Sequence, residues 1–227
     1  MLATRAIAEE AMDADDLDPA VYADVLRDLA QVNSVTMARR PTLEFLDRAT
    51  KGMSRFCLLD VGFGDGDMLR TIALWASRRG IEAELIGVDL NPRSLAAARS
   101  RTPGDLAIDY RIGDYADQPE GFDFVISSLV AHHMTHDQLI GFLRFMDARA
   151  IKGWFVNDLH RHGFAHAGYP VLATLFGWHP IVKADGQLSI ARSYRPHEWP
   201  PLLAEAGIEG ARVVRRFPFR LCVECVR

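Results

Sequence analysis

The chain has 227 residues, a formal net charge of −4 and 49% hydrophobic residues, which suits one α/β domain with some additional helices. The acidic balance gives no electrostatic reason to expect nucleic acid as a partner. No apolar run approaches the roughly 18 residues of a membrane span. The three cysteines suit a reducing compartment better than a disulfide framework. We therefore expect a cytoplasmic protein, either a monomer or a homodimer.

The first 50 residues predict helices. Asp18 and Pro19 are suited to the N-cap and the first turn of a helix, and apolar residues follow them at helical spacing. A second helix is expected over 41–49. We expect region 1–50 to form a helical cap, and two readings remain open: a lid over a ligand, or helices that only pack on the core. Residues 51–227 are expected to form the main domain.

A strand, a glycine-rich turn and a helix follow in direct succession. The apolar run 56–59 predicts a strand buried on both faces, and 68–75 predicts the helix. Between them stand Asp60 and three glycines at alternate positions: Gly62, Gly64 and Gly66. Glycine is needed where the backbone takes a positive φ or where a ligand lies directly against it. The arrangement is typical of a nucleotide-binding loop.

The segment Asp60-Val61-Gly62-Phe63-Gly64-Asp65-Gly66 resembles the first motif of the class I S-adenosylmethionine-dependent methyltransferases. A dinucleotide-binding loop spaces its glycines as Gly-x-Gly-x-x-Gly instead. The resemblance implies that Asp60 and the three glycines hold the methionine end of S-adenosylmethionine. It also implies a Rossmann-like, doubly wound α/β fold whose seven-stranded sheet is mostly parallel and ends in an antiparallel C-terminal hairpin.

Further strands are expected in order along the chain, over 83–88, 108–112, 122–127 and 153–157. Asp89 closes the second strand, where its carboxylate is placed to accept hydrogen bonds from a ribose diol, and Leu90 lies beside it. Ligands of such sheets bind at the carboxyl ends of the strands. We therefore expect both residues to contact the cofactor.

The third and fourth strands also end in candidate cofactor residues. In the resembling family an acid after the third strand binds the adenine amino group and its neighbour covers the ring, which implies these roles for Asp114 and Tyr115. Ser127 and Ser128 end the fourth strand and are expected to reach the cofactor from the other side. Each acid taken alone is equally compatible with a helix cap or a turn.

Two adjacent histidines follow the fourth strand. The segment from Leu129 to Met134 resembles the Leu/His-His/Leu segment of ubiquinone- and menaquinone-biosynthesis methyltransferases, which act on small molecules. A histidine there can take a proton from a hydroxyl near neutral pH, so we expect His133 first, and His132 second, as catalytic residues. Because adjacent side chains face different ways, at most one is expected in the pocket. A structural hydrogen bond that holds the loop remains the alternative.

The connection 160–195 is longer than a usual α/β connection and is expected to build the substrate site. It carries five aromatic residues: Phe164, Tyr169, Phe176, Trp178 and Tyr194. After it, a helix is expected over 200–205 and two terminal strands over 211–216 and 220–226.

Two clusters have the composition of metal or redox sites. Cys222 and Cys225 lie inside a predicted strand, where positions i and i+3 point to opposite faces, so the two sulfurs diverge. Three histidines within 160–166, near Asp158, have directions that the sequence does not fix. We expect no metal ion at either place.

The sequence thus predicts an enzyme that uses S-adenosylmethionine to methylate a small acceptor, aromatic, phenolic or polyketide-like, more readily on oxygen than on carbon. Two alternatives remain. An NAD(P)-dependent oxidoreductase is disfavoured by the glycine spacing and by the terminal hairpin. A domain that binds the cofactor without turnover fits the same motifs. The sequence identifies neither the acceptor nor the need for a general base.

Overall fold

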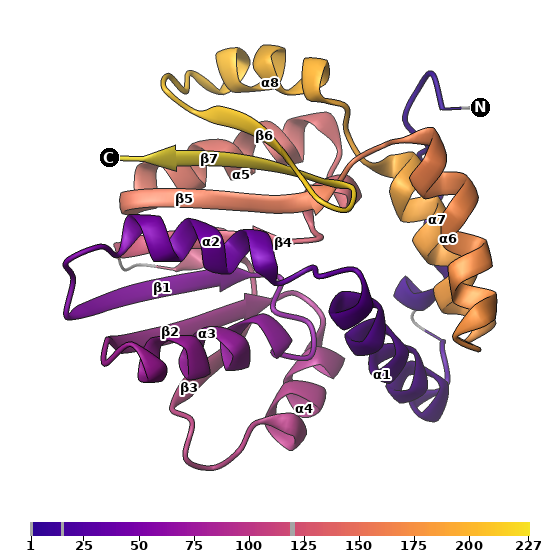
Figure 1. The fold of residues 1–227 in the computed structure, drawn as a ribbon, viewed down its shortest axis with the longest axis horizontal. Coiled ribbons are helices and arrows are strands. Elements are labelled where there is room, and N and C mark those ends of the chain that lie inside the picture. Colours follow the sequence, from indigo (N-terminus) through magenta and orange to yellow (C-terminus); the bar gives the residue numbers. More distant parts are fainter. Residues whose placement is uncertain (1, 15, 119–120) are drawn as a thin grey trace.

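The computed structural model describes residues 2–14, 16–118 and 121–227. In these residues seven strands form one sheet in the order β3-β2-β1-β4-β5-β7-β6 (Figure 1). Strands β1 to β5 are parallel to one another, and β7 runs antiparallel to both β5 and β6. This confirms the predicted Rossmann-like sheet with its antiparallel C-terminal hairpin. The strands are β1 (Arg55–Val61), β2 (Glu82–Asp89), β3 (Ile108–Ile112), β4 (Phe122–Ser128), β5 (Ala150–Leu159), β6 (Arg212–Arg216) and β7 (Arg220–Val226).

The helices begin and end close to the predicted positions. The side chain of Asp18, for example, caps the first helix, as predicted. The exception is the connection 160–195, which folds into a pair of helices that the sequence analysis did not predict. The helices are α1 (Pro19–Val35), α2 (Arg40–Ala49), α3 (Asp67–Arg78), α4 (Pro92–Arg101), α5 (His136–Arg149), α6 (Gly163–Leu175), α7 (Pro180–Arg192) and α8 (Trp199–Ala206). Short 3-10 turns are η1 (Ala11–Asp13), η2 (Tyr115–Asp117), η3 (Ala131–His133) and η4 (Pro196–Glu198).

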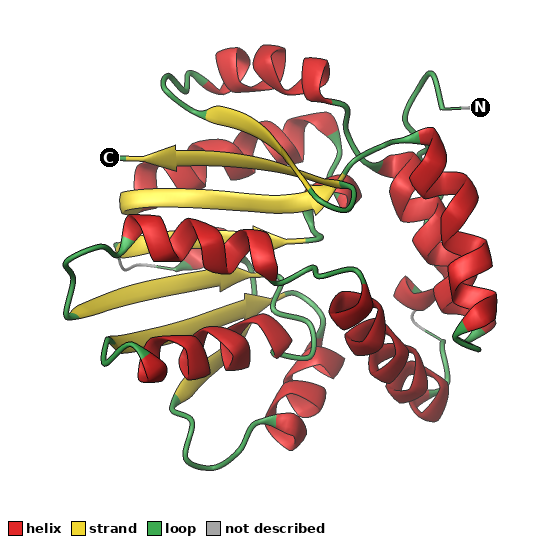
Figure 2. Cartoon of the chain, in the orientation of Figure 1, coloured by secondary structure: helices red, strands yellow, loops and turns green. Residues whose placement is uncertain are grey.

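Helices cover both faces of the sheet (Figure 2). Side chains alternate between the faces, so Leu58 packs with α2 and α3 while Leu59 packs with α5 and α8. Both leucines are fully buried, which explains the unbroken apolar run in β1. Cys222 belongs to the first of these cores and Cys225 to the second. Their sulfurs therefore lie on opposite faces, as predicted.

The helices α1, α6 and α7 stand apart from the sheet, beyond the carboxyl ends of its parallel strands (Figure 1). They share a small apolar core that includes Val25 of α1, Ala173 of α6 and Val182 of α7. Helix α2 instead packs on the sheet, where Phe45 stacks on Phe155 with ring centroids 4.8 Å apart. No helix in the described residues combines the length and apolar composition needed to cross a bilayer.

Candidate active site

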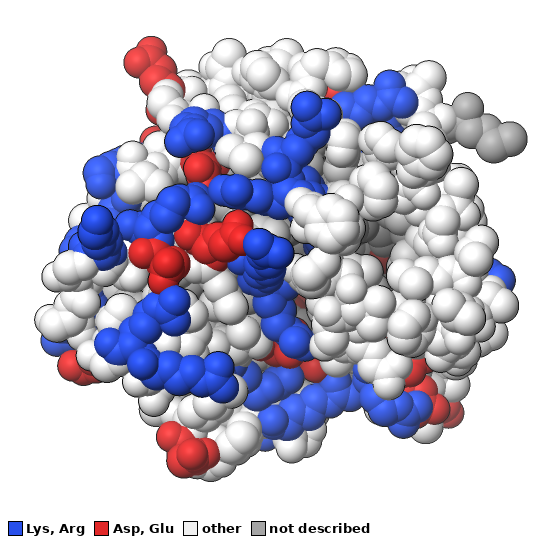
Figure 3. All heavy atoms as spheres, viewed as in Figure 1, with Lys and Arg blue, Asp and Glu red and all other residues white. Residues whose placement is uncertain are grey.

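A cavity of about 610 Å³ lies at the carboxyl ends of the parallel strands. Its wall combines the glycine turn after β1 with parts of α1, α6, α7, the loop after β4 and the turn between β6 and β7. Figure 3 shows the surface hollowed between α1 and the α6–α7 pair, where uncharged side chains surround the opening. The cavity therefore joins the predicted cofactor loop to the predicted substrate insert.

The three glycines of the turn have positive φ angles but different neighbours. A Cβ on Gly62 would lie 2.4 Å from Cγ2 of Val130, and one on Gly66 would lie 2.3 Å from the Tyr110 hydroxyl oxygen. A Cβ on Gly64 would meet no described atom within 4 Å. Gly62 and Gly66 thus allow close packing inside the protein. Gly64 alone of the three keeps its surroundings open.

Asp60 ends β1 at the cavity wall with an exposed fraction of only 1%. Its Oδ1 atom has no hydrogen-bond partner among the described residues. Burial, together with the charges of Asp89 and Asp67, raises the pKa of Asp60 well above its usual range. A buried carboxylate oxygen without a hydrogen-bond partner is energetically unfavourable. A cationic group in the cavity would supply the missing partner, so Asp60 suits the amino group of a bound methionine moiety.

Asp89 connects the glycine turn to the start of α4. Its Oδ2 accepts a hydrogen bond from the Gly64 backbone N–H at 2.8 Å, and its Oδ1 accepts one from the Asn91 N–H at 2.8 Å. Burial raises the pKa of Asp89, while these two N–H groups oppose the rise. The Ser94 hydroxyl is a third hydrogen-bond partner of this carboxylate. A carboxylate has about four lone-pair sites, and Asp89 lines the cavity, so it can still accept a hydrogen bond from a ribose hydroxyl.

Asp114 and Tyr115 lie outside the cavity wall. The exposed Asp114 side chain caps η2 by accepting a hydrogen bond from the Ala116 N–H at 2.8 Å. Tyr115 packs against Phe142 and Phe145 of α5, with ring centroids 5.0 Å and 4.8 Å away. Both residues stand where the sequence places them, at the end of β3, but their side chains have protein partners.

Three predicted cofactor residues remain, and only one of them lines the cavity. Leu90 is 71% exposed and Ser127 is 1% exposed, and neither lines the cavity. Ser128 does line it.

Within the described residues, positive φ angles outside glycine occur at Met37 and Leu129, and both of these residues also line the cavity. Such backbone conformations concentrate at functional sites.

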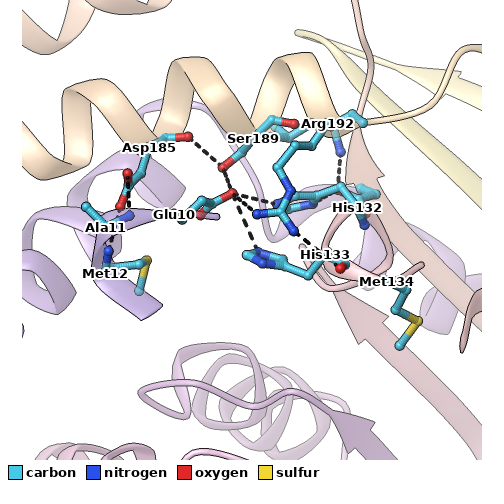
Figure 4. Close-up of polar contacts among 12 residues, drawn as sticks. Glu10, Ala11, Met12, His132, His133, Met134, Asp185, Ser189 and Arg192 are labelled. Atoms are coloured by element: carbon cyan, nitrogen blue, oxygen red, sulfur yellow. Dashed lines mark hydrogen bonds and ion pairs between the residues drawn. The ribbon is translucent and has the colours of Figure 1, made fainter. Parts of the chain in front are cut away.

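His132 and His133 both line the cavity and both approach Glu10 (Figure 4). The Glu10 Oε1 atom lies 3.6 Å from His132 Nε2 and 3.8 Å from His133 Nε2. The expectation that at most one histidine enters the pocket is therefore wrong. It assumed an extended chain, whereas the two residues belong to the 3-10 turn η3, where adjacent side chains can flank a common partner.

Asp158, at the end of β5, holds His132 in place. One carboxylate oxygen accepts the His132 backbone N–H at 2.9 Å and the other lies 2.7 Å from the ring Nδ1. Burial disfavours a charged ring, but Asp158 and Glu10 outweigh it and raise the pKa of His132 to about 9. His132 is thus an imidazolium at neutral pH, buried between two carboxylates.

Glu10 comes from the segment before α1, which the sequence analysis did not connect with the site. Its carboxylate is 3% exposed, accepts a hydrogen bond from the Ser189 hydroxyl at 2.7 Å and lies 3.7 Å from Arg192 Nη1. The backbone N–H groups of the next two residues donate to Asp185 of α7. Figure 4 shows Glu10 between the two histidines and the side chains of α7. No local pattern marks this residue; only the fold brings it to the histidines.

Glu10, His132 and His133 also form the one group in the described chain with the composition and spacing of a metal site, their ligand atoms lying within 4.8 Å of one another. Two cations already face Glu10, however: the imidazolium of His132 and the guanidinium of Arg192. A metal ligand must be deprotonated. The cluster therefore favours a protonated His132 over a bound metal ion, and we expect no metal at this place.

The raised pKa of His132 predicts a pH-dependent stability. The charged ring stabilises the fold fully below about pH 6.5, and this contribution is lost as the pH rises through about 9. A pKa shift of this size corresponds to about 3 kcal/mol. In urea unfolding, the stability difference between the wild type and His132→Gln should therefore shrink by up to that amount from pH 6 to 9.5. A difference that stays constant over this range would show that His132 is neutral in the folded protein.

Comparisons with known proteins identify a family for part of the chain and solved structures with the same fold. Residues 58–150 match the family described as "Methyltransferase domain", and no curated protein sequence matches the chain. Magnesium protoporphyrin IX methyltransferase from Synechocystis PCC 6803, solved with SAH, is similar over 95% of this chain and 91% of its own, with a TM-score of 0.57 and 18% identity. Human N-acetylserotonin methyltransferase with SAM gives a TM-score of 0.64 and 17% identity, over 92% of this chain and 56% of that one.

The plantazolicin methyltransferase BpumL, in complex with a triazolic desmethylPZN analog and SAH, has a TM-score of 0.63 at 13% identity, covering 89% of both chains. These likenesses extend over the whole fold, whereas the family match covers its cofactor half. The family match shows a methyltransferase domain over residues 58–150, and the structural likenesses show that the chain has the class I methyltransferase fold. Its cofactor is S-adenosylmethionine, and the oxidoreductase alternative finds no support.

Proposed function

We propose that this enzyme transfers the methyl group of S-adenosylmethionine to a hydroxyl oxygen of a small aromatic or polyketide-like acceptor in the cytoplasm. The observation that carries the proposal is the single cavity into which both the glycine turn and the Glu10–His133 pair open. The names of two similar proteins, the protoporphyrin and N-acetylserotonin methyltransferases, refer to small-molecule acceptors with aromatic rings, and this supports the acceptor class.

For the cofactor, we assign the amino group of the methionine moiety to Asp60, the ribose to Asp89 and the adenine amino group to Asp114. The backbone of the glycine turn passes along the methionine end. Arg39, which no sequence pattern singles out, also lines the cavity, and its Nε donates to Asp67 Oδ2 at 2.6 Å; its guanidinium suits the methionine carboxylate. Of the remaining predicted residues, we place Leu90 and Tyr115 around the adenine and Ser128, which lines the cavity, at the far side of the cofactor. Ser127 is buried outside the cavity wall and would act only by supporting Ser128.

The acceptor would occupy the part of the cavity covered by α1 and α6. Leu26 and Leu29 of α1 and Phe164 and Leu172 of α6 all line it, so this part of the wall is apolar and suits a ring system. Of the five aromatic residues predicted for this role, Phe164 and Tyr169 line the cavity and the other three do not. We therefore propose that the N-terminal helix α1 and the 160–195 insert together form the acceptor site.

When bound, S-adenosylmethionine supplies a methyl group that is already electrophilic, so the protein has to align the acceptor and, for a neutral hydroxyl, remove its proton. His133 is suited to accept that proton because its side chain is 32% exposed at the cavity and its Nε2 lies 3.8 Å from Glu10 Oε1. His132 is already protonated at neutral pH. We assign it the role of a positioning residue that holds Glu10 and the η3 turn.

The test uses S-adenosylmethionine labelled in its methyl group and a panel of phenols, each paired with its O-methylated form. Label should enter the free phenols as methyl ethers and leave the O-methylated forms unlabelled. Calorimetry with S-adenosylhomocysteine and with NADH provides the control for cofactor choice. Label on ring carbons would contradict O-methylation. Tight S-adenosylhomocysteine binding without transfer to any phenol would favour the non-catalytic alternative.

A further inference from the structure

Arg220 is a buried cation at the cavity wall that the proposed mechanism leaves without a role. It begins β7, directly after the Phe217–Phe219 turn, and its exposed fraction is 3%. Its Nη2 atom lies 3.4 Å from the Thr36 hydroxyl oxygen, a weak contact. Its Nη1 atom is buried and has no hydrogen-bond partner in the described parts of the chain. A buried donor of this kind is costly unless something pairs with it.

The protein does not supply a carboxylate for Arg220. Asp158 is the nearby acid whose charge acts on it, but both Asp158 oxygens already accept hydrogen bonds, from His132 and from the Leu159 N–H. No ion pair to Arg220 is found within 4.0 Å among the residues that the structure describes. Burial lowers the pKa of Arg220, against the effect of Asp158, yet an arginine stays charged in a protein. The cavity wall therefore carries a positive charge with no direct ion-pair partner among the described residues.

The place of Arg220 in the sheet separates it from the cofactor. Asp60 ends β1, and the sheet order puts β4 and β5 between β1 and β7. Three strand spacings amount to roughly 14 Å. The methionine carboxylate lies only a few atoms from the amino group that Asp60 is proposed to bind. Arg220 lines the cavity together with the Phe217–Phe219 turn that precedes it in the chain, and its Nη2 atom lies beside Thr36.

We propose that Arg220 binds an oxyanion of the acceptor, so that the enzyme selects acceptors that carry a carboxylate or a similarly acidic group beside an apolar ring. A guanidinium pairs with a carboxylate through two parallel hydrogen bonds, which would satisfy the orphaned Nη1. The apolar walls would hold the ring of the same molecule. The proposal rests on the proposed function for the placement of the acceptor in this cavity.

The test measures binding, so it does not depend on turnover. Hydroxylated benzoates and naphthoates, each paired with the phenol that lacks the carboxylate, are titrated into the enzyme saturated with S-adenosylhomocysteine. We expect at least one acid to bind about tenfold or more tightly than its uncharged counterpart. Arg220→Met should abolish that preference. Arg220→Lys, which keeps the charge but loses the paired hydrogen bonds, should retain only part of it.

Two controls make the result specific. Arg212→Met removes a 76% exposed arginine from the same hairpin and should leave the preference unchanged. S-adenosylhomocysteine and methylthioadenosine, which lacks the amino acid part, are compared in wild type and Arg220→Met. If the variant loses only S-adenosylhomocysteine affinity, Arg220 binds the cofactor carboxylate and the proposal is wrong. It is equally wrong if no acid is preferred by the wild type, or if the preference survives in Arg220→Met. Should the Met variant not fold, the Lys variant decides.

Discussion

Replacing His133 by alanine is expected to lower the turnover of a phenolic acceptor by 10² to 10⁴, the range that general bases typically contribute. The imidazole is the exposed member of the Glu10 cluster, and its loss leaves the acceptor hydroxyl without a proton acceptor. The affinity for S-adenosylhomocysteine should stay within about twofold, because the glycine turn, Asp60 and Asp89 are untouched. Raising the pH should restore part of the rate, since the acceptor then ionises in solution.

His132→Gln and Glu10→Gln provide the comparison for this variant. If His132 and Glu10 act by positioning His133, both should lower turnover less than His133→Ala and should leave the pH profile of the remaining activity similar in shape to that of the wild type. Full activity in His133→Ala would leave the histidine structural. If only His132→Gln lost activity, and its pH profile changed, the role of proton acceptor would be assigned to His132 instead.

The second large effect is expected at Gly64. Valine there would project into the open space next to Asp60 and Asp89 and obstruct the approach of the cofactor, while the backbone stays at a φ of 55°. We expect S-adenosylhomocysteine to bind at least roughly 100-fold more weakly, which is about 3 kcal/mol of binding free energy. Calorimetry measures the loss directly. Unaltered affinity in a folded Gly64→Val would mean that the turn does not hold the cofactor.

Gly80 supplies a matched control, because it also has a positive φ and open surroundings but lies in the turn after α3, away from the cavity. Gly80→Val should therefore show the same backbone strain, typically 1 to 2 kcal/mol, without loss of affinity. Gly62→Val tests another property. Its side chain would collide with Val130, so the expected effect is a less stable fold and a displaced η3 loop rather than a simple block of the cofactor.

The fold was predictable because its signals are local. The apolar run before Asp60 predicts a buried strand, the alternate glycines predict the turn, and the Asp18–Pro19 pair predicts where α1 begins; all three are confirmed. The ends of β1, β2 and β3 follow from the same patterns. Strand order follows from the resemblance to a known fold rather than from any single residue.

The active site was predictable only in part, because its polar contacts are not local. Glu10 reaches Ser189 across 179 positions of the chain, and nothing in the sequence around Glu10 points to α7. Arg220 reads as an ordinary strand residue next to the Phe217–Phe219 turn, and only the assembled sheet shows that its Nη1 atom is buried without a hydrogen-bond partner among the described residues. The pairing of both histidines with Glu10 depends on the 3-10 turn, which the sequence does not signal.

The attachment of the N-terminal segment has a consequence for the order in which the molecule forms during synthesis. Arg5 donates to the Arg192 carbonyl oxygen, and Glu10 contacts Ser189, so residues made first have to wait for residues that leave the ribosome more than 170 positions later. Contacts of such sequence separation form slowly and carry a large loop-closure entropy. The glycine turn and its strand partners, by contrast, span fewer than 40 positions from Arg55 to Asp89. A nascent chain should therefore acquire a nucleotide-binding surface well before it acquires the groups that handle the proton.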